Sequence, residues 1–122
     1  MRVLLSIKPE FAFKIFEGKK KFEFRKAIFK NPNVKTVVVY ASSPVQRVIG
    51  EFEIDIILSS APNEIWKQTK EHSGISEDFF YEYFADREIA HAIKIKKAKK
   101  YKQPLHLQDN YNVVPPQSYL YL

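Results

Sequence analysis

The stretch that decides the fold is "GKKKFEFR", Gly18 to Arg25, because a helix pattern gives way to a strand pattern within it. The preceding "PEFAFKIFE" begins with a proline suited to the first turn of a helix and repeats its apolar residues at i,i+4 spacing. Glycine adopts positive φ at little cost, so Gly18 predicts a left-handed end to that helix. We therefore expect the motif to begin where the chain leaves a helix.

After Gly18 the hydrophobic period changes from that of a helix to that of a strand. Phe22 and Phe24 alternate with polar residues, which predicts a strand with two core phenylalanines and a polar opposite face. That polar face carries Lys21, Glu23 and Arg25.

Lys20 precedes this strand, in the predicted helix-to-strand turn, and its long stem can reach Glu23. We expect Lys20, Glu23 and Arg25 to meet at one end of the sheet. A carboxylate between cations accepts hydrogen bonds, while the cations orient an anionic or carbonyl ligand. A desolvated lysine can instead act as a base or nucleophile. The alternative is a solvated ion-pair face that contributes little stability, and spacing alone leaves both interpretations open.

The rest of the chain reads as alternating strands and short helices. "VKTVVVYA" is apolar on both parities, as in a strand buried on two sides, whereas "RVIGEFEIDIIL" alternates as a half-buried strand with a glycine that marks a bend or bulge. Further strands are predicted for "RVLLSI", "IAHAIKIKKAKKY" and "SYLYL", and further helices for "APNEIWKQTKEH" and for "SEDFFYEYFA", capped by Ser76. These elements predict an α+β fold: a small β-barrel of five to six mostly antiparallel strands with about three short helices.

Length and composition favour one globular domain spanning residues 1–122, with 45% hydrophobic and 15% aromatic residues. The chain has no cysteine, and its three histidines lack ligand spacing, so we expect neither a metal nor another cofactor. The apolar runs are too short for a membrane span and no signal peptide is evident, which predicts a cytoplasmic protein. The formal charge of +6 favours polyanionic partners, above all nucleic acid.

Four segments, in order, resemble the ASCH domain family. Gly18, Lys20, Glu23 and Arg25 spell G-x-K-x-x-E-x-R, which is similar to the family signature. "VYASSPVQRVIGEFEI", "SGISEDFFYEYFADREIAHAIKI" and "VPPQSYLYL" resemble the strand-loop-strand, the helical insert with its returning strand, and the closing strand of ASCH proteins. The resemblance implies a barrel related to the RNA-binding PUA domains, with a cleft lined by the motif.

The resemblance also implies two classes of function. The first is a module that binds RNA, a nucleotide or a modified nucleoside and acts in transcription or RNA metabolism. The second is a metal-independent hydrolase. Some small ASCH proteins resemble amidohydrolases that deacetylate N4-acetylcytidine, and a ribonuclease is the other kind of hydrolase that the resemblance allows. Lys20 corresponds to the catalytic lysine of the amidohydrolases, but Glu23 stands where they have a threonine. Lys20 and Glu23 form the candidate catalytic pair, while Glu71 and Glu77 remain equal candidates for an additional acidic residue.

Other residues extend the candidate site. Ser42 and Ser43 end a predicted buried strand, where hydroxyl and backbone N–H groups bind phosphate or a base edge, and Arg47 follows as a phosphate contact. An ordinary turn is the alternative for the two serines. The ligand-binding residues expected from sequence are therefore Lys20, Glu23, Arg25, Ser42, Ser43 and Arg47.

Three further features have structural interpretations that compete with functional ones. Lysines from Lys94 to Lys102 are typical of a solvated strand edge, and their alternative is a nucleic-acid footprint. The aromatic residues between Phe79 and Phe84 have the spacing of core residues on a helix, although one exposed ring can still stack on a base. His91 shares a strand face with two isoleucines, which favours an inward-facing structural histidine. The sequence leaves the oligomeric state open.

Overall fold

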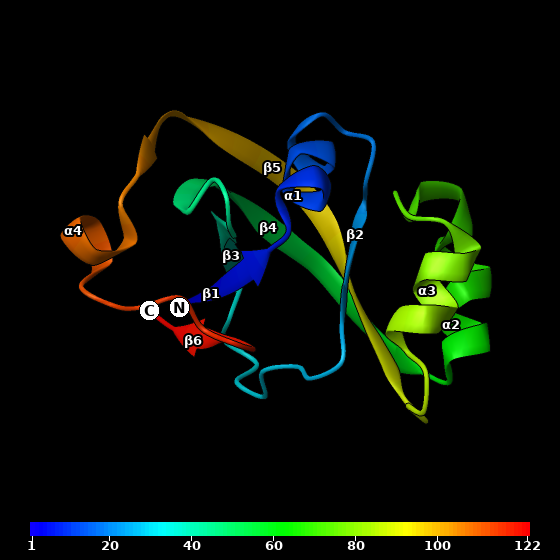
Figure 1. The fold of residues 1–122 in the computed structure, drawn as a ribbon. Helices are drawn as coiled ribbons and strands as arrows, with labels where there is room; N and C mark the ends of the chain where they lie inside the picture. The colour runs from blue at the N-terminus through cyan, green and yellow to red at the C-terminus, as the bar shows by residue number, and fades with distance from the viewer.

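A computed structural model describes residues 1–122 and shows one six-stranded sheet curled into a half-barrel (Figure 1). The strand order is β2-β5-β4-β3-β1-β6. All neighbours pair antiparallel except β1 and β3, which are parallel. The strands are β1 (Arg2–Ile7), β2 (Phe22–Arg25), β3 (Thr36–Ala41), β4 (Arg47–Ser60), β5 (Ala90–Leu105) and β6 (Leu120–Tyr121). The predicted class, with five to six mostly antiparallel strands, is confirmed.

Four α-helices and one 3₁₀ helix surround the sheet. They are α1 (Pro9–Phe16), α2 (Pro62–Thr69), the 3₁₀ helix η1 (Lys70–His72), α3 (Glu77–Tyr83) and α4 (Leu107–Tyr111). The first three α-helices lie where the sequence predicts them. The short helix α4 is additional, and its five residues are too few to show a helical period. No helix has the length and apolar character needed to cross a membrane.

Local sequence signals explain where the helices begin and end. Pro9 occupies the first turn of α1, and Gly18 beyond its C-terminal end has φ of 78°, as the sequence predicts. Ser76 caps α3, because its Oγ accepts a hydrogen bond of 3.1 Å from the Phe79 backbone N–H.

The long strands β4 and β5 bend through irregularities in their pairing. Next to Gly50 the register shifts, and a Cβ there would lie 2.6 Å from both the Lys99 carbonyl and the Phe16 ring, so only glycine fits. Two more shifts follow, between Glu53 and Ile54 and between Ile54 and Ile57, and within the last of them 49% of Ile56 is exposed. The strict alternation predicted for this strand therefore fails at Ile56, because a bulge changes the face that follows it.

The core is divided by the sheet. Along β3, Val37 and Val39 pack into a cluster inside the curl with α1, while Val38 and Tyr40 pack into a cluster on the other face with α4. This arrangement confirms the prediction of a strand buried on both sides. A third cluster joins β2 and β5 to α2 and α3, and it includes Phe22, Phe24, Ile65, Phe80, Phe84, Ala90 and Ala92.

The half-barrel stays open on the side that holds the site. Strand β2 is one edge of the sheet, and β1 with the two-residue β6 forms the other edge. In Figure 1, α1 lies beside β5 near β2, the pair α2 and α3 stands beyond β2, and the two chain termini lie together at β1 and β6. Residues of the end of β1, of α1, of α3 and of the C-terminal segment meet beside β2 and line one pocket.

Candidate functional site

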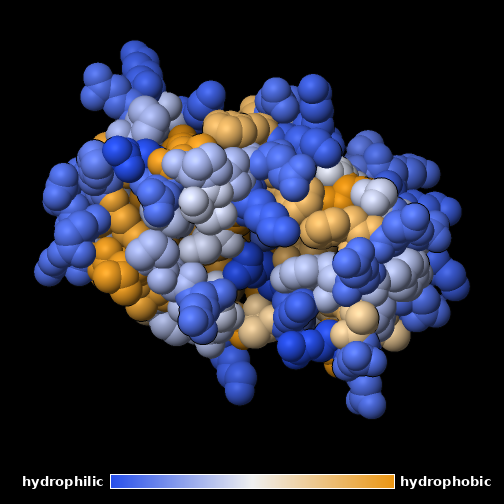
Figure 2. Space-filling view, viewed as in Figure 1, coloured by the Kyte–Doolittle hydropathy of each residue, from blue (hydrophilic) through white to orange (hydrophobic).

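A pocket of about 240 Å³ opens at the edge of β2. Its walls come from the end of β1, from α1, from β2, from α3 and from the C-terminal segment. The lining residues are Ser6, Ile7, Lys8, Phe11, Lys20, Glu23, Phe24, Arg25, Ile75, Phe79, Tyr83 and Gln117. The structure thus brings Lys20, Glu23 and Arg25 together in one concave site. On the face shown in Figure 2, a hydrophilic band separates two areas where apolar residues reach the surface.

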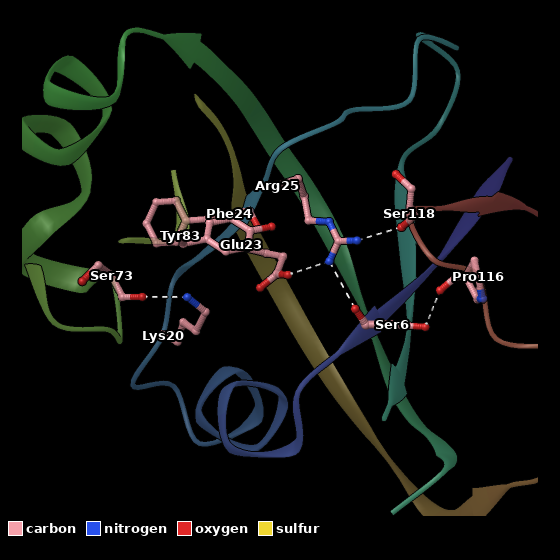
Figure 3. A network of polar contacts seen from close by, with 9 residues as sticks. All are labelled: Ser6, Lys20, Glu23, Phe24, Arg25, Ser73, Tyr83, Pro116 and Ser118. Carbon is pink, nitrogen blue, oxygen red and sulfur yellow. Dashed lines mark hydrogen bonds and ion pairs between the residues drawn. The ribbon is translucent and has the colours of Figure 1, made fainter. Parts of the chain in front are cut away.

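Lys20 is the buried cation of this pocket, with only 2% of its surface exposed. Its Nζ donates a 2.8 Å hydrogen bond to the Ser73 carbonyl and lies 4.6 Å from the centre of the Phe24 ring (Figure 3). No carboxylate lies within ion-pair distance of it. Burial lowers the pKa of Lys20 from 10.5 to about 8. The negative charge of Glu23 opposes this shift, and the positive charge of Lys14 adds to it.

The buried Glu23 forms an ion pair with the partly buried Arg25, with 3.2 Å between Glu23 Oε2 and an Arg25 guanidinium nitrogen. The same guanidinium donates to the Ser6 carbonyl on β1, at 3.2 Å, and to the Ser118 carbonyl, at 2.7 Å (Figure 3). Arg25 therefore bridges the open side of the half-barrel, from β2 to β1 and the C-terminal segment. These three protein acceptors engage three of the five N–H donors of the guanidinium, so Arg25 holds the ion pair and ties β2 to the segments across the opening.

Aromatic rings of α3 form one wall of the pocket. Phe79 and Tyr83, one turn apart on α3, have nearly parallel rings with 10° between their planes and 6.3 Å between centroids. Each ring lies beneath an exposed lysine: Lys8 Nζ is 5.5 Å from the Phe79 centroid, and Lys26 Nζ is 4.7 Å from that of Tyr83. Two aromatic rings thus line the pocket, and an exposed cation lies over each of them.

Burial also acts on the hydroxyl of Tyr83. It donates a 3.4 Å hydrogen bond to the Phe24 carbonyl, and burial raises the pKa of this phenol above its usual value of 10.0, more than the charge of Arg25 lowers it. Tyr83 therefore stays a neutral hydrogen-bond donor through the physiological pH range.

The loop residues expected from sequence lie outside this pocket. Neither Ser42, Ser43 nor Arg47 is among its lining residues. The backbone N–H of Ser42 donates to the Ile7 carbonyl at 3.0 Å, and Arg47 donates to the Gln46 carbonyl at 2.8 Å. These contacts match the turn interpretation of the loop.

The remaining candidates are dispersed. The lysines of β5 are exposed, and Lys94 pairs with Asp55 at 3.7 Å. His91 is half-buried, its Nδ1 lies 2.7 Å from Ser59 Oγ, and burial lowers the pKa of its imidazole. No group of three or more metal-ligating side chains occurs in the protein.

The aromatic wall is predicted only in part, because the sequence allows one exposed ring of this helix to stack on a base but does not place two rings in the site. The i,i+4 spacing of Phe79 and Tyr83 places them on one side of α3, whereas Phe80 and Phe84 occupy the core side and are 0% and 2% exposed. The burial of Phe80 and Phe84 agrees with the core interpretation of this helix. The i,i+4 spacing of Phe79 and Tyr83 is visible in the sequence. Which side of α3 packs against the core is not.

The fold and this pocket define a PUA-like half-barrel with a polar site at its open edge. The family model of the ASCH domain matches residues 5–99, so the chain belongs to the ASCH domain family. The signature-like motif of the sequence contributes Lys20, Glu23 and Arg25 to the polar lining of the pocket, beside Ser6, Lys8 and Gln117.

Similar proteins agree with this assignment. An ASCH domain-containing ribonuclease of Zymomonas mobilis is 31% identical over 123 residues, which cover 98% of this chain and 82% of the relative. The crystal structure of ASCH from Zymomonas mobilis superposes with a TM-score of 0.91 at 30% identity, over 99% of this chain and 87% of the other. A protein of Ureaplasma parvum named large ribosomal subunit protein uL22 is 31% identical over 121 residues, and the chain spans only 39% of its length.

Proposed function

We propose that the pocket binds a nucleobase of RNA, or of a free modified nucleoside, and that the protein is an RNA-binding module active in the cytoplasm as a single domain of residues 1–122. The observation that carries this proposal is the convergence of a buried lysine, a buried carboxylate and aromatic side chains in one cavity. Membership of the ASCH family and the net charge of +6 support it.

The size of the cavity favours a single ring system. Pockets for drug-sized ligands typically span roughly 300–1,000 Å³. The cavity at β2 measures about 240 Å³, so it is suited to one base rather than to a folded segment of RNA. A base that enters it lies against Phe79 and Tyr83, and stacking of this kind contributes about 1–3 kcal/mol per base.

The polar groups supply recognition of a base edge. Lys20 donates hydrogen bonds and Glu23 accepts them, so together they complement an edge that presents a carbonyl beside an amino or imino group. Arg25 holds Glu23 in position from the side that faces the barrel. A surface built only for phosphate gains nothing from a buried carboxylate, so Glu23 favours base recognition over backbone binding.

The cations at the rim suit the sugar-phosphate backbone. Lys8 and Lys26 are exposed and lie above the two aromatic rings. A strand whose base occupies the pocket passes its phosphates near these ammonium groups. Binding through them weakens as salt rises, in proportion to the number of phosphates contacted.

The binding test compares Lys20→Ala and Tyr83→Ala with the control Lys19→Ala, whose lysine is 70% exposed in its side chain. Fluorescence anisotropy is measured with a panel of single-stranded and structured RNAs at fixed salt, and the fold is checked by circular dichroism. We expect Tyr83→Ala to weaken binding by about 5- to 150-fold, which corresponds to the loss of one stacked base. The proposal fails if Lys20→Ala and Tyr83→Ala both fold and bind like the control.

A second candidate is a metal-independent hydrolase in which Lys20 and Glu23 act on RNA or on an acylated cytidine. The observation that favours it is the lowered pKa of Lys20, about 8, since an amine that titrates near neutrality serves as an acid or a base. The Zymomonas mobilis relative carries the name ribonuclease, which supports the same class. The ion pair of Glu23 with Arg25 weighs against Glu23 as a free base.

Turnover assays separate the two candidates. The protein is incubated with end-labelled RNA and, separately, with N4-acetylcytidine, with a chelator present and with Lys20→Ala in parallel. Cleavage in chelator that is lost in Lys20→Ala supports the hydrolase. Turnover equal to that of the variant, or cleavage that requires added Mg²⁺, contradicts it.

A further inference from the structure

Three consecutive backbone carbonyls, from the last residue of η1 into the loop before α3, accept hydrogen bonds from α1 and from the helix-to-strand connection that carries the pocket lysine. The His72 carbonyl accepts from the Lys21 backbone N–H at 2.9 Å, and the Ser73 carbonyl accepts from Lys20 Nζ at 2.8 Å. The Gly74 carbonyl accepts from Lys14 Nζ at 3.1 Å. We call these three acceptors the carbonyl triplet. Two ammonium groups are thus held on neighbouring peptide units.

The packing at Gly74 makes this arrangement tight. Gly74 has φ of 71°, and a Cβ there would lie 2.6 Å from both Cβ and Cγ of Lys20. The stem of Lys20 therefore runs directly against the backbone of Gly74. The Ser73 side chain is part of the same unit, because its Oγ donates to the Ile75 carbonyl at 2.9 Å and is buried. The carbonyl triplet has little freedom to move away from Lys20.

Lys14 is connected to Lys20 a second time through the backbone. Its own carbonyl accepts the N–H groups of both Lys19, at 2.9 Å, and Lys20, at 3.1 Å. Lys14 therefore contacts both the connection that carries Lys20 and the loop that holds the Lys20 amine. It is half-buried and lies outside the pocket lining, so it acts on the site without forming part of it.

We propose that Lys14 is a positioning residue for the pocket lysine: it fixes the carbonyl triplet through Gly74, and its ammonium charge acts on the neighbouring Lys20 amine. The inference rests on the proposed function only where it assumes that Lys20 binds a ligand. The effect of Lys14 on the position and titration of Lys20 does not depend on that ligand.

The charges around Lys20 determine in which direction Lys14 shifts the pKa of the Lys20 amine. The charged and titratable groups that share its surroundings are Lys14 on α1, Glu23 and Arg25 on β2, Tyr83 on α3 and Lys8 at the pocket rim. The charge of Glu23 raises the pKa of the Lys20 amine, while burial and the like charge of Lys14 lower it. Removal of the Lys14 charge therefore favours the protonated form of Lys20.

The test measures the Lys20 titration directly by NMR of the side-chain Cε and Nζ resonances, in the wild-type protein and in Lys14→Met, Lys14→Arg and Lys19→Met. We expect Lys14→Met to raise the Lys20 pKa and to increase amide exchange at residues 73–75. Lys14→Arg keeps the charge and a donor and is expected to match the wild type, as is the exposed control Lys19→Met. If Lys14→Met does not fold, Lys14→Gln provides the same comparison of charge.

The pH profile of RNA binding is the second measurement. Its midpoint is expected to move upward in Lys14→Met together with the Lys20 pKa. A Lys14 that only stabilises the fold, without acting on the carbonyl triplet or on the Lys20 amine, moves neither. An unchanged or lowered Lys20 pKa in a folded Lys14→Met protein overturns the inference. Because this titration needs no ligand, failure of the proposed function would leave its outcome intact.

Discussion

The cost of burying the Lys20 ammonium is the most quantitative prediction of the structure. Lys20 has an ordinary pKa of 10.5 when unfolded and about 8 in the folded protein. The unfolded chain therefore binds more protons than the folded one between these values, and stability rises with pH in this window. Linkage from these two pKa values gives a gain of about 2 kcal/mol in unfolding free energy between pH 7 and pH 9.5.

The assay is urea denaturation at half-unit steps from pH 7 to pH 9.5, for the wild-type protein and for Lys20→Met. The methionine keeps the apolar stem of the side chain and removes its titration. Both proteins contain Tyr83 and Tyr101, whose pKa values are raised, so the contribution of these tyrosines cancels in the difference between the two curves. We expect the wild type to gain about 2 kcal/mol relative to Lys20→Met across this range. Two curves that stay parallel would refute the reasoning, because they would mean that Lys20 titrates like an exposed lysine.

Three further outcomes follow from the site. Gly74→Ala is expected to lower the unfolding free energy by about 2 kcal/mol or more, measured by urea denaturation, because its φ of 71° is strained for alanine and the added Cβ meets Lys20. Arg25→Met is expected to cost about 3–5 kcal/mol, because it leaves Glu23 buried without its partner. The matched double variant with Glu23→Gln should recover part of that loss, and no recovery would contradict the pairing. Tyr83→Phe should keep RNA affinity within about threefold of the wild type, because the ring face remains.

Much of the fold could be predicted because local signals and hydrophobic period agree along most of the chain. Pro9, Gly18 and Ser76 mark helix ends with residues whose backbone preferences are strong, and β3 shows burial on both parities. The predictions fail where a tertiary effect decides. The bulge that exposes Ile56 leaves no signature in composition, and the five residues of α4 are too few to show a period.

The site could be predicted in part for the same reason. Strand parity places Glu23 and Arg25 on one face, and the turn at Lys20 lets its stem reach the same pocket. Parity does not reveal that Arg25 is engaged with β1 and the C-terminal segment, since Ser6 and Ser118 are far from it in sequence. The partners of Lys20 were equally hidden, because the Ser73 carbonyl is more than fifty residues away.

The most direct test of the central claim is an NMR titration of the isotope-labelled protein with single nucleotides and a short RNA. If the pocket holds a base, the largest shift changes fall on Lys20, Phe79 and Tyr83, and the same residues respond to the nucleotide and to the RNA. Changes confined to the β5 lysines or to the loop of Ser42 and Ser43, with the pocket resonances unmoved, would contradict the account.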